Sequence, residues 1–249
     1  MISSPFLAGR DRYERRTDGW VDNTHEDALT HTVTITDDDS SIELSAVCTV
    51  SPGYEIREAR ARVLAGAMDA GICDAVGRLR GTRMVAGFTK QLVEVCGTRA
   101  GLLVDAGIEI ARLARQVTKL PPSMTAGLRP GDARRCWQLD TTGWAELPNS
   151  CFTYSAAGRA LLDSLPVATP MAVDLYSPPA GAKKVFVRRK LSRLVSTERR
   201  LHLFHSMHDN VHGFDLHYEI DLDSRTVVAA DSITSRLPYG GVCSEPQRK

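Results

Sequence analysis

The segment Thr32–Val50 reads TVTITDDDSSIELSAVCTV, and it decides how the chain folds. Apolar and polar residues alternate in Thr32–Thr36 and again in Ile42–Val50, as in half-buried β-strands. The intervening Asp37–Ser41 consists of Asp and Ser, which favour turns. Two alternating segments around such a turn predict a β-hairpin.

A second pair of alternating segments, Arg199–Met207 and His212–Leu222, lies near the C-terminus. The intervening Asp209-Asn210 is typical of a two-residue hairpin turn. Strands paired about this turn place Met207 opposite His212 and His205 opposite Phe214. One face of the hairpin then gathers the apolar residues, and we expect it to face the core. This face carries Leu201, Leu203, His205, Met207, His212, Phe214, Leu216 and Tyr218.

The two hairpins indicate an internal repeat, in which Arg15-Arg16 aligns with Arg199-Arg200, Thr32–Thr36 with Leu216–Ile220, and Ile42–Val50 with Val227–Thr234. The sequence therefore predicts an α+β fold, an antiparallel sheet built from two repeated β-hairpins with amphipathic helices packed on one face. We expect a single fused domain over residues 1–249. Residues 10–120 form the first half with its helices, residues 121–182 are connecting strands and loops, and residues 183–249 are a second copy without helices.

The middle of the chain carries the other predicted elements. Apolar periodicity and composition favour helices at Tyr54–Arg80, at Arg99–Lys119 with Thr98 as its N-cap, and from Ser155 to Leu165. Three short apolar segments resemble strands: Arg135–Asp140, Ser150–Tyr154 and Ala172–Tyr176.

Composition limits the class of protein. The chain has 249 residues, a net charge of +1 and 43% hydrophobic residues, which is typical of a soluble globular protein. The small charge argues against nucleic acid or a membrane surface as a partner. The N-terminal residues do not resemble a signal peptide. The six cysteines include no C-x-x-C pair, so we expect a cytoplasmic protein with reduced thiols. A homo-oligomer is compatible with all of this.

The histidines are the strongest sign of chemistry. Five of the seven fall within His202–His217, and imidazole titrates nearest neutrality. The hairpin pairing places His205 and His212 as diagonal neighbours on the apolar face, His202 opposite His217 on the other face, and His208 at the turn. Burial favours neutral imidazole, which accepts a proton near pH 7. We therefore predict His205 and His212 as catalytic base and acid, with Tyr218 as a hydrogen-bond donor and Asp209 as an orienting carboxylate.

Other residues are candidates for substrate binding. Trp137 and Tyr154 could line an apolar pocket, and Arg188 and Arg189 could hold a carboxylate or phosphate. The chain lacks G-x-S-x-G, G-x-G-x-x-G and P-loop patterns, so we predict no organic cofactor. No metal is predicted either. The alternative is a divalent metal held by His205 and His212, with His31, His25, Asp27 or Glu219 as candidates for the third ligand.

One set of features resembles a known family. The paired basic residues, the hairpin with its closing Pro52, and Cys96-Gly97-Thr98 opening an amphipathic helix are similar to a bacterial domain-of-unknown-function family over roughly residues 10 to 140. Genes of that family often lie near genes for catabolism of aromatic or acyl-CoA compounds. The family has Gly-Cys-Thr-His at this turn, whereas this chain has Arg99 in place of the histidine, so no role of that histidine transfers. The resemblance implies small-molecule metabolism.

The sequence thus favours a cofactor-independent enzyme that uses histidine acid–base chemistry on an apolar, aromatic or acyl substrate. Lyase, hydratase, isomerase and hydrolase reactions all fit such a site. Two alternatives stay open: a metal-dependent enzyme with the same histidines as ligands, and a non-catalytic binding or assembly subunit.

Overall fold

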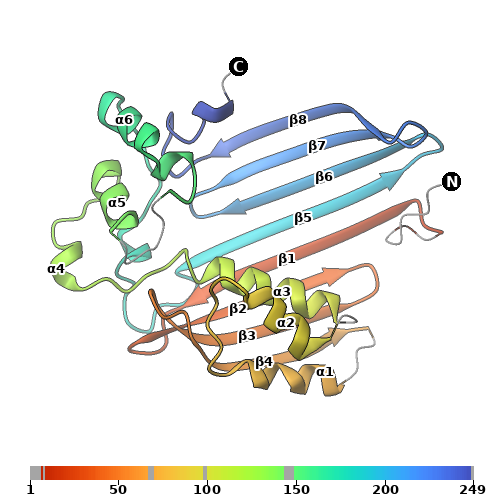
Figure 1. The fold of residues 1–249 in the computed structure, drawn as a ribbon, viewed down its shortest axis with the longest axis horizontal. Helices are drawn as coiled ribbons and strands as arrows, with labels where there is room; N and C mark the ends of the chain where they lie inside the picture. The colour runs from red at the N-terminus through yellow and green to blue at the C-terminus, as the bar shows by residue number, and fades with distance from the viewer. Residues whose placement is uncertain (1–6, 8, 67–69, 98–99, 143–148, 248–249) are drawn as a thin grey trace.

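The computed structural model describes residues 7, 9–66, 70–97, 100–142 and 149–247. Within these residues the chain forms an eight-stranded antiparallel sheet with helices against part of one face (Figure 1), which confirms the α+β class. The strands are β1 (Arg12–Asp22), β2 (Ala28–Asp37), β3 (Ser41–Thr49), β4 (Ile56–Ala65), β5 (Phe186–Ser196), β6 (Arg200–Asp209), β7 (Gly213–Asp221) and β8 (Thr226–Arg236).

The α-helices lie between the two halves of the sheet in sequence, and a last 3₁₀ turn follows β8. They are α1 (Ala70–Ala75), α2 (Phe88–Cys96), α3 (Gly101–Leu113), α4 (Pro122–Thr125), α5 (Ala133–Asp140) and α6 (Ala156–Ser164), with short 3₁₀ turns η1 (Val76–Leu79), η2 (Phe152–Tyr154), η3 (Val173–Leu175) and η4 (Glu245–Gln247). Figure 1 shows α2 and α3 over the β1–β4 half, and α4, α5 and α6 beyond one end of the sheet.

The sheet order is β4-β3-β2-β1-β5-β6-β7-β8, so the first and fifth strands meet at the centre. Their pairing runs from Arg12 opposite Val195 to Val21 opposite Phe186. Each half is a four-stranded meander that runs outward from this pair. Continuous hydrogen bonding across the centre joins the two halves into one sheet.

Both predicted hairpins are present, as β2–β3 and as β6–β7. The predicted repeat, however, aligns β1 with β6. By position in the sheet, β1 corresponds to β5, because these are the two central strands. The predicted repeat therefore matches each aligned strand of the first half to the strand that follows its true counterpart in the second half.

The predicted helix Tyr54–Arg80 is wrong over its first half, which is strand β4. Its many Ala and Arg residues favour a helix by propensity, but pairing with β3 overrides that preference. A register shift lets Ile56 pair with Cys48 and Glu58 pair with Val47, so Arg57 is an extra residue. This bulge interrupts the alternation that would have revealed the strand.

The three short predicted strands are also wrong. Arg135–Asp140 belongs to helix α5, whose N-cap Asp132 accepts a hydrogen bond from the Arg135 amide at 3.0 Å. Ser150–Tyr154 contains the turn η2, and Ala172–Tyr176 contains η3. Helix α6 follows its predicted cap Ser155, which accepts from the Gly158 amide. Helix α3 is shorter than predicted, and Thr98 and Arg99 lie outside the described residues.

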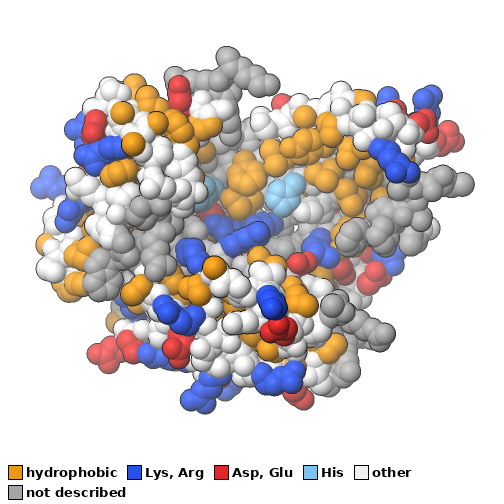
Figure 2. All heavy atoms as spheres, in the orientation of Figure 1, with side chains coloured by type: hydrophobic (Ala, Val, Ile, Leu, Met, Phe, Trp, Pro, Cys, Tyr) orange, Lys and Arg blue, Asp and Glu red, His pale blue; other side chains and the backbone are white. Residues whose placement is uncertain are grey.

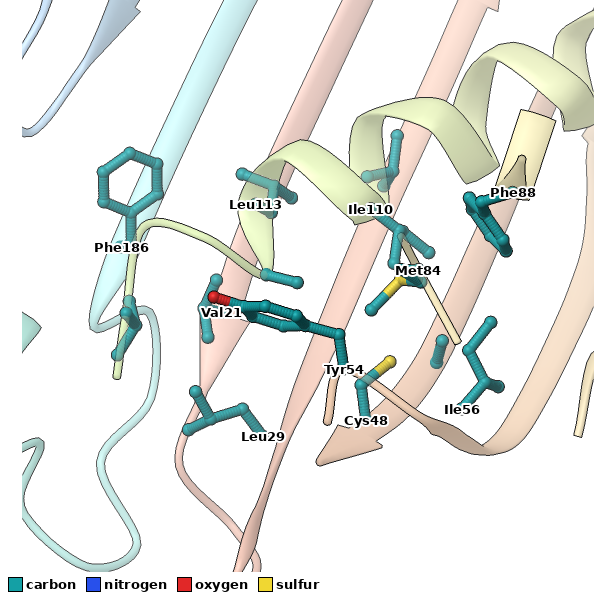
Figure 3. Packing of buried hydrophobic residues seen from close by; sticks show 14 of the residues in the cluster. Val21, Leu29, Cys48, Tyr54, Ile56, Met84, Phe88, Ile110, Leu113 and Phe186 are labelled. Atoms are coloured by element: carbon teal, nitrogen blue, oxygen red, sulfur yellow. The ribbon is translucent and has the colours of Figure 1, made fainter. Parts of the chain in front are cut away.

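The main core lies between α3 and the β1–β4 half, on what we call the front face of the sheet. Leu113 and Ile110 project from α3 toward the strands, beside Tyr54, Met84 and Phe88 (Figure 3). Gly19 permits this close contact, because a Cβ there would lie 2.8 Å from a Leu113 methyl carbon. The opposite face of this half carries mainly Thr, Ser, Arg, Glu and Asp, most of them partly or fully exposed.

Truncation of Leu113, which is fully buried, tests the position of this core. Leu113→Ala should lower the free energy of unfolding by about 2–5 kcal/mol, because it removes apolar contacts and leaves a cavity. Leu64→Ala is the matched control, since Leu64 is 45% exposed, and it should change stability little. Urea denaturation measures both. An equal loss of stability in Leu113→Ala and Leu64→Ala would show that α3 does not pack against the sheet as described.

Candidate active site

The front face of β5–β8 differs from that of β1–β4, because no described helix packs over its middle (Figure 1). Residues that pair across β5, β6 and β7 place their side chains next to one another on this face, and we call each such set of three a row. The first row, nearest α5, is Arg188, Asp209 and His212. The next rows are Lys190, Met207 and Phe214; Ser192, His205 and Leu216; Leu194, Leu203 and Tyr218; and Ser196, Leu201 and Ile220.

The register of β6 and β7 corrects the predicted one by two residues. Met207 pairs with Phe214 and His205 with Leu216, rather than with His212 and Phe214. The turn is Asn210-Val211, because the Asp209 carboxylate accepts the amides of Val211 and His212 at 2.8 and 2.6 Å. A shift of two residues leaves every side chain on its predicted face.

A network of buried charges joins this half of the sheet to α3. The Arg188 guanidinium donates to Asp209 at 2.8 Å and to Glu109 of α3 at 3.3 Å, and Lys190 also donates to Glu109. The side chains of Arg188, Glu109 and Asp209 are at most 7% exposed. Buried charges are tolerated only when they are paired, so this network fixes α3 against β5 and β6.

His212 completes the first row. Its Nδ1 lies 3.1 Å from the Asp209 carboxylate. Burial alone would raise the pKa of Asp209, but the hydrogen bond and charge of His212 and the charge of Arg188 outweigh it and lower that pKa to about 2. Asp209 is therefore an ionised acceptor, so Nδ1 of His212 carries the proton and Nε2 is left as the basic nitrogen.

His212 lines a cavity of about 220 Å³ at the end of the sheet, beyond the last residues of the strands. The cavity lies between the end of α3, the segment around η2, the segment around η3 and the chain that follows β8. Most of its lining is apolar, which is typical of a small-molecule site. The polar groups that share it with His212 include Asp140, Cys151, Tyr154, Tyr176 and Tyr239.

A buried carboxylate at the end of α5 organises this cavity. Asp140 accepts hydrogen bonds from the hydroxyls of Tyr154, Tyr176 and Tyr239 at 2.8, 2.9 and 2.5 Å. Burial raises the pKa of Asp140, and the three donors partly offset this. Burial also raises the pKa of each tyrosine, so the hydroxyls stay neutral donors. Four separate segments are thereby joined around one cavity wall.

The predicted catalytic residues divide into two groups. Asp209 and His212 are in contact, as predicted. His205 lies two rows away, roughly 13 Å along the strand, so the predicted diagonal contact with His212 is wrong. Tyr218 lies one row beyond His205, on the same face but away from the cavity. His205 bonds instead to Ser192 at 2.8 Å, and burial and the charge of Lys190 lower its pKa.

The predicted binding residues also divide. Tyr154 lines the cavity, and Arg188 belongs to the charge network beside it. Trp137 lies outside the cavity lining, with its indole N–H donated to the Thr153 carbonyl. Arg189 is on the other face of the sheet, exposed, beside Asp18.

The histidines of the other face do not form the predicted pair. His202 pairs with Glu219, and His217 pairs with Phe204. His208 lies 3.1 Å from Asp215. Among the residues that the structure describes, no group of three or more His, Cys, Asp or Glu side chains is arranged to hold a metal ion, and the two predicted ligands His205 and His212 lie in different rows.

Several residues of the site were not predicted: Glu109, Lys190, Asp140, Tyr176 and Tyr239. Glu109 had a signal, since it lies on the buried face of α3 between Ala106 and Ile110, where a charge requires a partner. The tyrosines and Asp140 come from distant segments, and no local pattern connects them.

Comparison with protein-family models, with curated proteins and with solved structures finds no match to this chain. None of the described helices is long and apolar enough to cross a membrane. The candidate site therefore rests on its own geometry.

The lowered pKa of Asp209 predicts how stability depends on pH. The folded pKa of about 2 lies below the ordinary value, so the stabilisation from the ionised carboxylate is complete above about pH 4 and is lost as the pH falls toward 2. Between about pH 5 and about pH 2 the wild type should lose about 2 kcal/mol more than Asp209→Asn. Asp223→Asn, at an exposed carboxylate, is the control. Urea denaturation at each pH measures the difference, and parallel curves for wild type and Asp209→Asn would contradict the prediction.

Proposed function

We propose that the protein is a small-molecule enzyme in which His212 moves a proton to and from a substrate bound in the cavity of about 220 Å³. One observation carries the proposal: the buried Asp209 carboxylate holds Nδ1 of His212 at 3.1 Å, while His212 lines the cavity. Asp209 orients the ring and stabilises the imidazolium that forms when Nε2 takes a proton, which is the role of the carboxylate in acid–base catalysis by histidine.

The surroundings of His212 support a preorganised site. Asp209 is itself fixed by Arg188 and by two backbone amides, so the imidazole is held by a rigid network. The cavity is mainly apolar, so its substrate is largely apolar with a polar reacting group. The proposal uses no organic cofactor, and it fits lyase, hydratase, isomerase and hydrolase reactions.

The proposal assigns different roles to the two histidines predicted from the sequence. His212 transfers the proton, whereas His205, two rows away, contacts the part of the substrate outside the cavity. A cytoplasmic location belongs to the same proposal, since Cys48 and Cys136 are buried thiols, as expected in a reducing compartment.

Deuterium uptake and product formation together test this function, because a lyase, hydratase or isomerase exchanges a substrate proton with solvent whereas a hydrolase forms new products. The purified protein is incubated in deuterated water with ketones, enoyl and hydroxyacyl thioesters and aryl esters, and deuterium uptake and product formation are followed by NMR. His212→Gln, which keeps a donor for Asp209, should lower the rate on the active compound by roughly 10²–10⁴-fold.

His202→Gln is the control, because His202 lies on the opposite face of the sheet, and it should keep the wild-type rate. A rate unchanged in His212→Gln would overturn the proposal. A protein that binds these compounds but neither exchanges their protons nor converts them would instead be a binding protein.

A further inference from the structure

The front face of β6 and β7 forms an apolar track that begins beside His212. Moving away from His212, the paired side chains on these strands are Met207 and Phe214, His205 and Leu216, Leu203 and Tyr218, and Leu201 and Ile220. Only His205 interrupts the aliphatic and aromatic series. Figure 2 shows the hydrophobic side chains gathered over this half of the sheet, bordered by Lys and Arg side chains on the side toward α3.

The charge on this face is confined to one end. Arg188 and Lys190 lie in the first two rows, and the rows from Ser192 onward carry no Lys, Arg, Asp or Glu on β5, β6 or β7. Lys190 donates to Glu109, yet an ammonium group has three protons to donate, and its side chain is 15% exposed. The face therefore carries paired charges with spare N–H donors of Lys190 beside His212 and is apolar beyond it, which matches a ligand with a hydrogen-bond-accepting acidic head and an apolar chain.

The size of the track favours a small ligand over a protein partner. From Leu201 to Met207 the strand spans roughly 20 Å, and the four strands β5–β8 span about 15 Å. An area of roughly 300 Å² is much smaller than the roughly 800 Å² that each partner buries in a stable protein–protein interface. A single extended hydrocarbon chain fits both the shape and the charge.

We propose that the substrate is a linear fatty acyl compound whose carboxyl-derived head lies against His212 and Lys190 and whose chain extends over the track between β6 and β7. The position of the head rests on the proposed function. The position of the chain rests on the apolar rows alone. Leu203 and Leu216 contact the middle of the chain, and His205, kept neutral by burial, contributes a flat ring to the same surface.

Binding of free fatty acids tests the track directly. Displacement of the fluorescent fatty acid cis-parinaric acid by butanoic, octanoic and hexadecanoic acids measures affinity against chain length. We expect roughly fourfold tighter binding for each methylene that the track buries. Leu203→Ser and Leu216→Ser should each weaken the binding of hexadecanoic acid at least tenfold and leave the binding of butanoic acid unchanged. These side chains are only half-buried, so both variants should fold, and circular dichroism checks this.

Ile233→Ser is the matched control, because Ile233 is 55% exposed and pairs with Asp215 on the opposite face of the sheet. It should leave every affinity unchanged. Affinities that do not rise with chain length, or that survive Leu203→Ser and Leu216→Ser, would overturn the proposal. A dimer in light scattering that Leu203→Ser dissociates, with no fatty acid bound, would overturn it in favour of a second copy.

Failure of this proposal is distinguishable from failure of the proposed function. His212→Gln should retain most of the affinity for hexadecanoic acid, since the chain rather than the head supplies most of the binding. Binding that depends on chain length, without any turnover, would contradict only the proton-transfer role of His212. Turnover of short compounds, with no dependence on chain length, would contradict only the proposed binding of an acyl chain along the track.

Discussion

The buried carboxylate of Asp209 is the group on which the candidate site depends. It accepts the two amides that set the turn between β6 and β7, and it thereby fixes which residues of these strands lie opposite each other. It pairs with Arg188, which extends the network to Glu109 and holds α3 against the sheet. It also orients His212. One ionised group therefore connects the strand register, the packing of α3 and the proposed chemistry.

The charge network lies between a part of the sheet that helices cover and a part that they leave open. Helices α2 and α3 bury the front face of β1–β4, whereas the apolar rows of β5–β7 stay mostly half-buried. The charge network lies along the boundary, where α3 meets β5. An acidic head group and an apolar chain would find their complements on either side of this boundary. The cavity near Asp140 is lined by His212 but by no residue of the apolar rows.

Alternation of polar and apolar residues was enough to predict part of this fold. It identified the hairpin of Thr32–Val50 and the front-face residues of β6 and β7. It failed for β4, where Arg57 forms a bulge, and for α5, whose short length hides its helical period. The two-residue error in register arose because the bonds of the Asp209 side chain select the turn. Asp140 and its three tyrosines come from four segments, so only the folded chain reveals them together.

The ring tautomer of His212 is the sharpest test of the role assigned to Asp209. Nitrogen NMR of the histidine side chains, recorded at a pH where imidazole is neutral, distinguishes protonation at Nδ1 from protonation at Nε2. With Asp209 as acceptor, His212 should carry its proton on Nδ1 and leave Nε2 basic, and this preference should disappear in Asp209→Asn. A proton on Nε2 in the wild-type protein would contradict that role, because the nitrogen assigned to proton transfer would then be unable to accept a proton.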